Sequence, residues 1–140
     1  MSGEQALAER VVKGMIAKDE FSRWLGIETV EIAPGRSVVR MRVRREMVNG
    51  FGVSHGGIVY SLADSALAFA ANTNGNVTVA IENSISYPQP VAIDDVLTAT
   101  ADEDSFTNRL GFYRVTVRNQ NDVLVAIFRG TVYRTQRPHG

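Results

Sequence analysis

The sequence predicts an α+β domain in which a curved antiparallel β-sheet wraps around one long central α-helix, with a further helix at the N-terminus. The apolar run over 58–71 is rich in Ala and Leu and contains no Pro, as expected of a helix. Two strand-like segments precede this run and four follow it. Because the helix is apolar on nearly all sides, it needs cover on nearly all sides, and a curved sheet supplies that cover.

Composition is that of a single globular domain over 1–140, a length sufficient for a sizeable core. Fifteen basic residues balance 15 acidic ones, so no nucleic acid or anionic membrane is expected as a partner. We see no signal peptide and no apolar run long enough to span a bilayer. The absence of cysteine excludes disulfides and thiol catalysis. It also fits a reducing cytoplasm, where we expect the protein.

The N-terminal part should form one amphipathic helix over 3–23, packed across an open end of the sheet. Strands follow over 26–33 and 37–45, joined by a Pro34-Gly35 turn. Basic and apolar residues alternate in the second of them. We interpret its basic residues as a solvated strand face paired with acidic residues, and a coenzyme A phosphate patch is the alternative. These residues are Arg36, Arg40, Arg42 and Arg44.

The part after the central helix should form four strands. They are expected over 77–87, 95–104, 109–119 and 123–134. In the third, Phe112, Val115 and Val117 are expected to share one face. The tail over 135–140 is expected to be frayed, with His139 on the surface.

Asp64 is the only charged residue between Glu46 and Glu82, and it lies on the otherwise apolar helix. A carboxylate is costly to bury unless it is paired or hydrogen-bonded. Asp64 is therefore either a catalytic acid, base or nucleophile, or a partly exposed side chain bonded to nearby backbone. The helix by itself favours neither.

The helix begins with Gly56 and Gly57, directly after His55, so backbone N–H groups can approach a ligand with no side chain in the way. Its first turn also carries unpaired donors and a partial positive charge, which suit a phosphate or a thioester oxyanion. Gly56 and Asp64 are about 12 Å apart along such a helix, too far to touch one carbonyl. If both serve one reaction, they come from different subunits of a symmetric dimer.

Asn49, His55-Gly56-Gly57 and the Leu62-Ala-Asp64-Ser-Ala66 segment resemble the signature of hotdog-fold acyl-CoA thioesterases. The phenylacetic-acid-degradation group is the most similar, with further matches over 25–27, 95–101 and 125–131. The resemblance implies a hotdog fold and a homodimer with shared sites, assembled as a dimer of dimers. It also implies an acyl-CoA substrate, here with an aromatic acyl group such as phenylacetyl or a ring-hydroxylated derivative. No cofactor is implied.

The resemblance also implies roles for individual residues. The Gly56 N–H polarises the thioester carbonyl, while Asp64 of the partner subunit activates water or attacks the carbonyl directly. His55 hydrogen-bonds the carbonyl or orients its loop. Asn49 positions water or the partner carboxylate, unless it is only a turn residue before Gly50. Substrate-binding residues are expected at Gly57, Pro88, Gln89, Asn108 and Arg109, and the N-terminal helix is a possible lid.

Other chemistries lack the residues that they need. We expect no Ser-His-Asp nucleophile elbow, and His55 has no His or Cys at metal-ligand spacing, so no metal is expected. Some relatives place a Ser or Thr on the next strand to assist the water, but here that position falls near Ala80. The remaining alternatives are a hotdog-fold hydratase or dehydratase and a non-catalytic acyl-CoA-binding protein.

Overall fold

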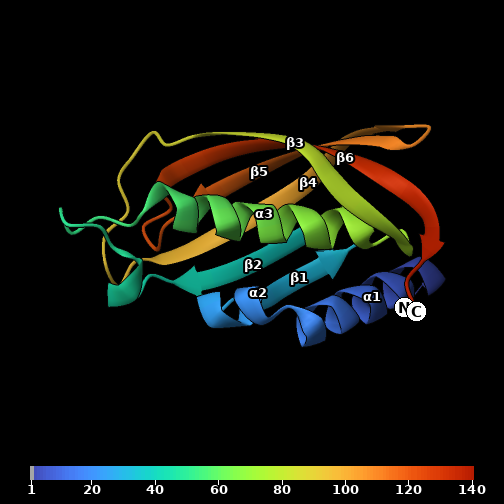
Figure 1. Ribbon diagram of the computed structural model, residues 1–140, viewed down its shortest axis with the longest axis horizontal. Helices are drawn as coiled ribbons and strands as arrows, with labels where there is room; N and C mark the ends of the chain where they lie inside the picture. Colours follow the sequence, from blue (N-terminus) through green and yellow to red (C-terminus); the bar gives the residue numbers. More distant parts are fainter. Residues whose placement is uncertain (1) are drawn as a thin grey trace.

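The computed structural model describes residues 2–140 and shows a curved antiparallel sheet around one long helix (Figure 1), which confirms the predicted architecture. The helical elements are α1 (Gly3–Lys18), α2 (Glu20–Leu25), the 3-10 helix η1 (Arg45–Met47) and the central helix α3 (Gly56–Asn72). The strands are β1 (Glu28–Ala33), β2 (Arg36–Arg42), β3 (Asn76–Ser86), β4 (Val96–Thr107), β5 (Leu110–Arg118) and β6 (Leu124–Pro138).

The six strands follow the spatial order β1-β2-β4-β5-β6-β3, and all neighbours are antiparallel. The chain leaves the sheet after β2, forms α3, and returns as β3 at the far edge. β1 and β3 are therefore the two edge strands. This connection places α3 in the concave side of the sheet, where it packs against strands β2 to β6 (Figure 1).

The core lies between α3 and the inward side chains of the strands. Leu62, Leu67 and Phe69 of α3 are fully buried there, as is Phe128 of β6. Burying a side chain of this size contributes about 1.5–3 kcal/mol. The apolar composition of α3 thus follows from its place between the strands.

The prediction of which β5 side chains face inward was wrong for one residue, Phe112. Tyr113, Val115 and Val117 are buried, whereas the side chain of Phe112 is 39% exposed on the opposite face. Strand side chains alternate with a period of two, so residues 112 and 115 cannot share a face in a regular strand. The aromatic ring of Tyr113 points inward, and its hydroxyl donates to Glu103 at 2.8 Å.

The expected single helix over 3–23 is in fact two helices. α1 ends at Lys18, and the side chain of Asp19 accepts a hydrogen bond from the Ser22 backbone N–H at the start of α2. The Ser22 hydroxyl also lies 2.8 Å from that of Ser65 on α3. This polar junction docks α2 onto α3, a tertiary contact that periodicity does not reveal.

The C-terminal tail is ordered rather than frayed, contrary to expectation. β6 continues to Pro138, which pairs with Asn76 of β3. The backbone N–H of His139 donates to Gly75, and its ring nitrogen Nε2 lies 2.8 Å from Oδ1 of Asn72. His139 is half-buried. The polar residues after 134 carry no strand pattern, so only the neighbouring β3 reveals their structure.

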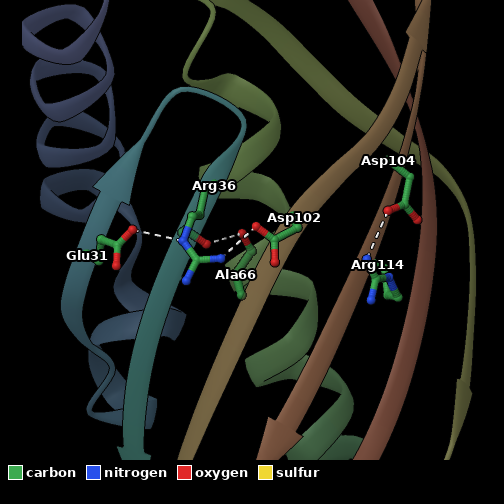
Figure 2. Close-up of polar contacts among 7 residues, drawn as sticks. Glu31, Arg36, Ala66, Asp102, Asp104 and Arg114 are labelled. Carbon is green, nitrogen blue, oxygen red and sulfur yellow. Dashed lines mark hydrogen bonds and ion pairs between the residues drawn. The ribbon is translucent and has the colours of Figure 1, made fainter.

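The basic residues of β2 are paired with acids, as predicted. Figure 2 shows Arg36 between Glu31 of β1 and Asp102 of β4, at 2.8 and 2.7 Å. These two carboxylates raise the pKa of Arg36. Arg40 of the same strand pairs with Glu28 and Arg42 pairs with Asp94, while Arg44, which lies beyond the end of β2, pairs with Glu46. Such partly exposed pairs contribute little to stability, and they neutralise the face that could have been a phosphate patch.

Candidate active site

Asp64 lies on a stripe of α3 that the rest of the chain covers only in part. The stripe follows helical spacing and consists of Gly57, Ser61, Asp64 and Ala68. Burial raises the pKa of the Asp64 carboxyl above its ordinary value, a hydrogen bond from Asn83 opposes this, and the nearby charge of Asp19 adds to it. A raised pKa makes a carboxylate a better proton acceptor near neutral pH.

Asn83 of β3 reaches α3 through its side-chain amide. Its Nδ2 donates to Oδ1 of Asp64 at 3.2 Å and to the hydroxyl of Tyr60 at 3.0 Å. The ring of Tyr60 packs edge-on against Phe128, with centroids 5.4 Å apart. Sequence reasoning missed Asn83 and Tyr60, although an Asn inside a strand is unusual and could have drawn attention.

Gly56 is the first residue of α3, and the predicted glycine opening is confirmed. The hydroxyl of Tyr87, just beyond β3, donates to the Gly56 carbonyl at 2.8 Å. A Cβ at position 56 would lie 3.1 Å from that hydroxyl, so glycine permits this close approach. Gly57 follows in the same exposed first turn. Tyr87 is the third residue that sequence reasoning missed.

The loop before α3 holds the two other predicted catalytic residues. His55 precedes the first turn, is exposed, and donates from its backbone N–H to Met47 at 2.9 Å. The Asn49 side-chain oxygen accepts from the backbone N–H groups of Phe51 and Val53, at 2.8 and 3.3 Å. Asn49 therefore fixes its own turn. Only its amide nitrogen is left for a water or a partner subunit.

The predicted substrate-binding residues divide between the two ends of α3. Pro88 and Gln89 directly follow Tyr87 and so lie beside Gly56. Asn108 and Arg109 form the β4–β5 turn, which lies at the end of α3 opposite Gly56 (Figure 1). Within one chain the structure therefore does not bring these two pairs together.

Position 80, where a hydroxyl that assists the water was considered, is an alanine and supplies none. Ala80 is exposed and lies at an irregular point of β3. The neighbouring Thr78 is buried, and its hydroxyl donates to the Asn76 carbonyl. The donor that reaches Asp64 is instead the side-chain amide of Asn83.

Within residues 2–140, no group of three His, Cys, Asp or Glu side chains could hold a metal ion. Over the same part of the chain, no helix is both long and apolar enough to cross a membrane.

A family model described as the thioesterase superfamily matches residues 51–126. The acyl-coenzyme A thioesterase PaaI of Escherichia coli is 38% identical over 86% of this chain and 86% of its own length. A putative esterase of Archaeoglobus fulgidus is 38% identical over 91% of this chain and 83% of its own.

Solved structures give the same match in three dimensions. The E. coli PaaI protein from the phenylacetic acid degradation operon superimposes with a TM-score of 0.94 at 34% identity, covering 96% of this chain and 97% of its own. A hypothetical thioesterase of Streptococcus pneumoniae, solved with coenzyme A, gives a TM-score of 0.77 at 25% identity, covering 81% and 88%.

Proposed function

This chain belongs to the thioesterase superfamily and, with the acyl-coenzyme A thioesterase PaaI as a 38% identical relative, is an acyl-CoA thioesterase with the hotdog fold; we propose that it hydrolyses aromatic acyl-CoA thioesters. Phenylacetyl-CoA and its ring-hydroxylated derivatives are the proposed substrates. Support for the aromatic group comes from the similarity to the PaaI protein of the phenylacetic acid degradation operon. The observation that carries the catalytic proposal is the half-buried Asp64, held by Asn83 on the helix that begins with Gly56.

In the proposed reaction, the N–H of Gly56 polarises the thioester carbonyl and stabilises the oxyanion that forms there. Asp64 takes a proton from water, which adds to the carbonyl carbon, or it attacks that carbon itself to give a mixed anhydride that water then hydrolyses. In both routes the carbon–sulfur bond breaks and coenzyme A leaves as a thiolate, which takes up the proton that Asp64 removed from water or a proton from the solvent. His55 and the amide nitrogen of Asn49 are proposed to orient the carbonyl and the water.

We propose that the two groups meet across a homodimer. Gly56 and Asp64 are eight residues apart on α3, about 12 Å along the axis, so one thioester cannot touch both in a single chain. β3 is an edge strand, and its Val79 and Ile81 are 48% and 58% exposed. An exposed apolar edge strand is suited to pairing with a second copy. Assembly as a dimer of dimers remains part of the proposal.

A dimer also gives the predicted coenzyme A contacts a common site. Pro88 and Gln89 lie beside Gly56, whereas Asn108 and Arg109 lie at the other end of the helix. Two antiparallel copies of α3 would bring Asn108 and Arg109 of one subunit toward the Gly56 end of the other. We therefore propose that both pairs, with Gly57, contact the coenzyme A part of one substrate. The S. pneumoniae thioesterase solved with coenzyme A supports this ligand class.

The test measures thiol release from phenylacetyl-CoA and from a medium-chain acyl-CoA. Wild type should favour the phenylacetyl substrate, and Asp64→Asn should lose hydrolysis while it still binds the substrate. Ser61→Ala, on the same partly buried stripe, is the matched control and should hydrolyse like wild type. An Asp64→Asn protein as fast as wild type would overturn the catalytic role, and a preference for the medium chain would overturn the aromatic specificity.

A subunit-mixing experiment tests the shared site. Gly56→Pro removes the amide donor, Asp64→Ala removes the carboxylate, and each protein alone should be inactive. A mixed dimer contains one site with both groups intact, so activity should return on mixing. If the mixture stays inactive although mixed dimers form, the two groups do not act across subunits.

A further inference from the structure

We infer that Asn83 is a positioning residue that holds Oδ1 of Asp64 and leaves the second oxygen, Oδ2, for the reacting water or thioester. The inference rests on the catalytic role proposed for Asp64. It adds a residue on β3 that the sequence analysis did not select.

The hydrogen-bond geometry fixes the amide in one orientation. The amide nitrogen of Asn83 has two hydrogens, and both have acceptors on α3, Tyr60 at 3.0 Å and Asp64 at 3.2 Å. Tyr60 and Asp64 are one helical turn apart and thus share a face. Turning the amide over would point its oxygen at the carboxylate, which is repulsive. Asn83 therefore presents a donor, and only a donor, to Asp64.

The sheet keeps Asn83 in place from the other side. Asn83 pairs with Gly130 of β6, and a Cβ at position 130 would lie 2.8 Å from Oδ1 of Asn83. The absence of a side chain at Gly130 therefore makes room for the amide. Oδ1 is buried and, among residues 2–140, meets no hydrogen-bond donor. A buried acceptor without a donor is destabilising, so packing alone does not account for an amide here.

Electrostatics point to the same role. Burial raises the pKa of Asp64, and Asp19, at the junction of α1 and α2, raises it further. Asn83 acts in the opposite direction, because a donor stabilises the ionised carboxylate. Tyr60, the other titratable group at the amide, accepts from Asn83. In the part of the chain that the structure describes, Asn83 is the group that favours the charged form that a base or nucleophile needs.

The test compares three proteins with wild type. Asn83→Ala removes the donor, and Asn83→Asp keeps the shape but places a second carboxyl beside Asp64. Ser84→Ala, on the opposite face of the same strand and exposed, is the matched control. The readouts are the pH profile of kcat, KM, and the carboxyl carbon NMR signal of Asp64 in the free protein. That signal is assigned by its disappearance in Asp64→Asn.

If Asn83 positions Asp64, the acid limb of kcat and the NMR titration both move to higher pH in Asn83→Ala, and further in Asn83→Asp. At neutral pH the kcat of Asn83→Ala falls about tenfold, which is within the loss caused by a misplaced catalytic group, and KM stays within about twofold. Ser84→Ala leaves every readout unchanged. Asp64 titrating alike in wild type and Asn83→Ala overturns the inference, whether or not the protein hydrolyses thioesters. An active Asp64→Asn would instead refute the proposed function.

Discussion

The hydroxyl of Tyr87 donates a hydrogen bond to the carbonyl oxygen of Gly56 over 2.8 Å. This contact joins the end of β3 to the first turn of α3, 31 residues earlier in the chain. Burial raises the pKa of Tyr87, so the hydroxyl keeps its proton and remains a donor. The backbone whose N–H is proposed to hold the oxyanion is thus oriented by a side chain from the sheet.

Tyr87→Phe should reduce kcat by about threefold to tenfold, because the loss of one hydrogen bond of about 0.5–1.5 kcal/mol loosens the first turn of α3. Tyr133→Phe, which removes a similarly exposed hydroxyl from β6, is the control and should leave kcat unchanged. Steady-state hydrolysis of phenylacetyl-CoA measures both variants. Equal rates for Tyr87→Phe and wild type would show that the contact does not position Gly56.

Asp64→Asn should make the folded protein more stable at pH 7, although it removes activity. The pKa of Asp64 is raised in the folded state above its ordinary value of 3.8, so the ionised carboxylate opposes folding. The stability that the protonated carboxyl provides is present below the unfolded pKa and is lost as pH rises through the folded pKa. Urea unfolding at several pH values should therefore show a gap between the two proteins that narrows toward acid. A less stable Asp64→Asn protein at pH 7 would contradict this account.

Gly130→Ala should destabilise the fold by roughly 1–3 kcal/mol, the usual cost of overpacking. The new Cβ would lie 2.5 Å from Leu67 and 2.8 Å from Asn83, both in the core between helix and sheet. Gly14→Ala is the matched control, because nothing lies within 4 Å of a Cβ there, in the exposed middle of α1. It should stabilise the protein by about 0.5–1 kcal/mol. Denaturant unfolding gives both values, and a neutral Gly130→Ala would show that the core adapts.

His139 should make stability depend on pH near neutrality. Burial lowers its pKa, and the charges of Arg137 and Lys18 lower it further. A lowered pKa means that the unfolded chain binds the proton more readily. The stability contributed by neutral His139 is thus present above its ordinary pKa of 6.5 and is lost as pH falls through the folded pKa. The free energy of unfolding of wild type, taken relative to that of His139→Gln, should fall between pH 7.5 and 5.5. Identical slopes would exclude this contribution.

The sequence by itself determined the class of fold, and the resemblance of its motifs to those of hotdog-fold thioesterases indicated the kind of chemistry. The apolar run over 58–71, the glycines before it and the single carboxylate within it predicted a buried central helix with Asp64 and Gly56 on it. These are local signals, since periodicity, glycine and an isolated charge can be read along one segment. The outer arginines of β2 could be interpreted in the same way, because alternation and the neutral composition indicated acidic partners.

Only the tertiary structure decided which groups surround Asp64. Asn83, which donates to Asp64, comes from β3, and the chain order places β3 at the far edge of the sheet. Tyr87, just beyond β3, holds Gly56, and Gly130 of β6 makes room for Asn83. The break between α1 and α2 and the pairing of the last residues of β6 likewise depend on partners distant in sequence. Hydrogen bonds of this kind join residues that are far apart in the sequence, and strand order and register decide which of them become neighbours in space. No pattern within one segment carries that information. The residue that holds the Asp64 carboxylate could therefore be identified only from the tertiary structure.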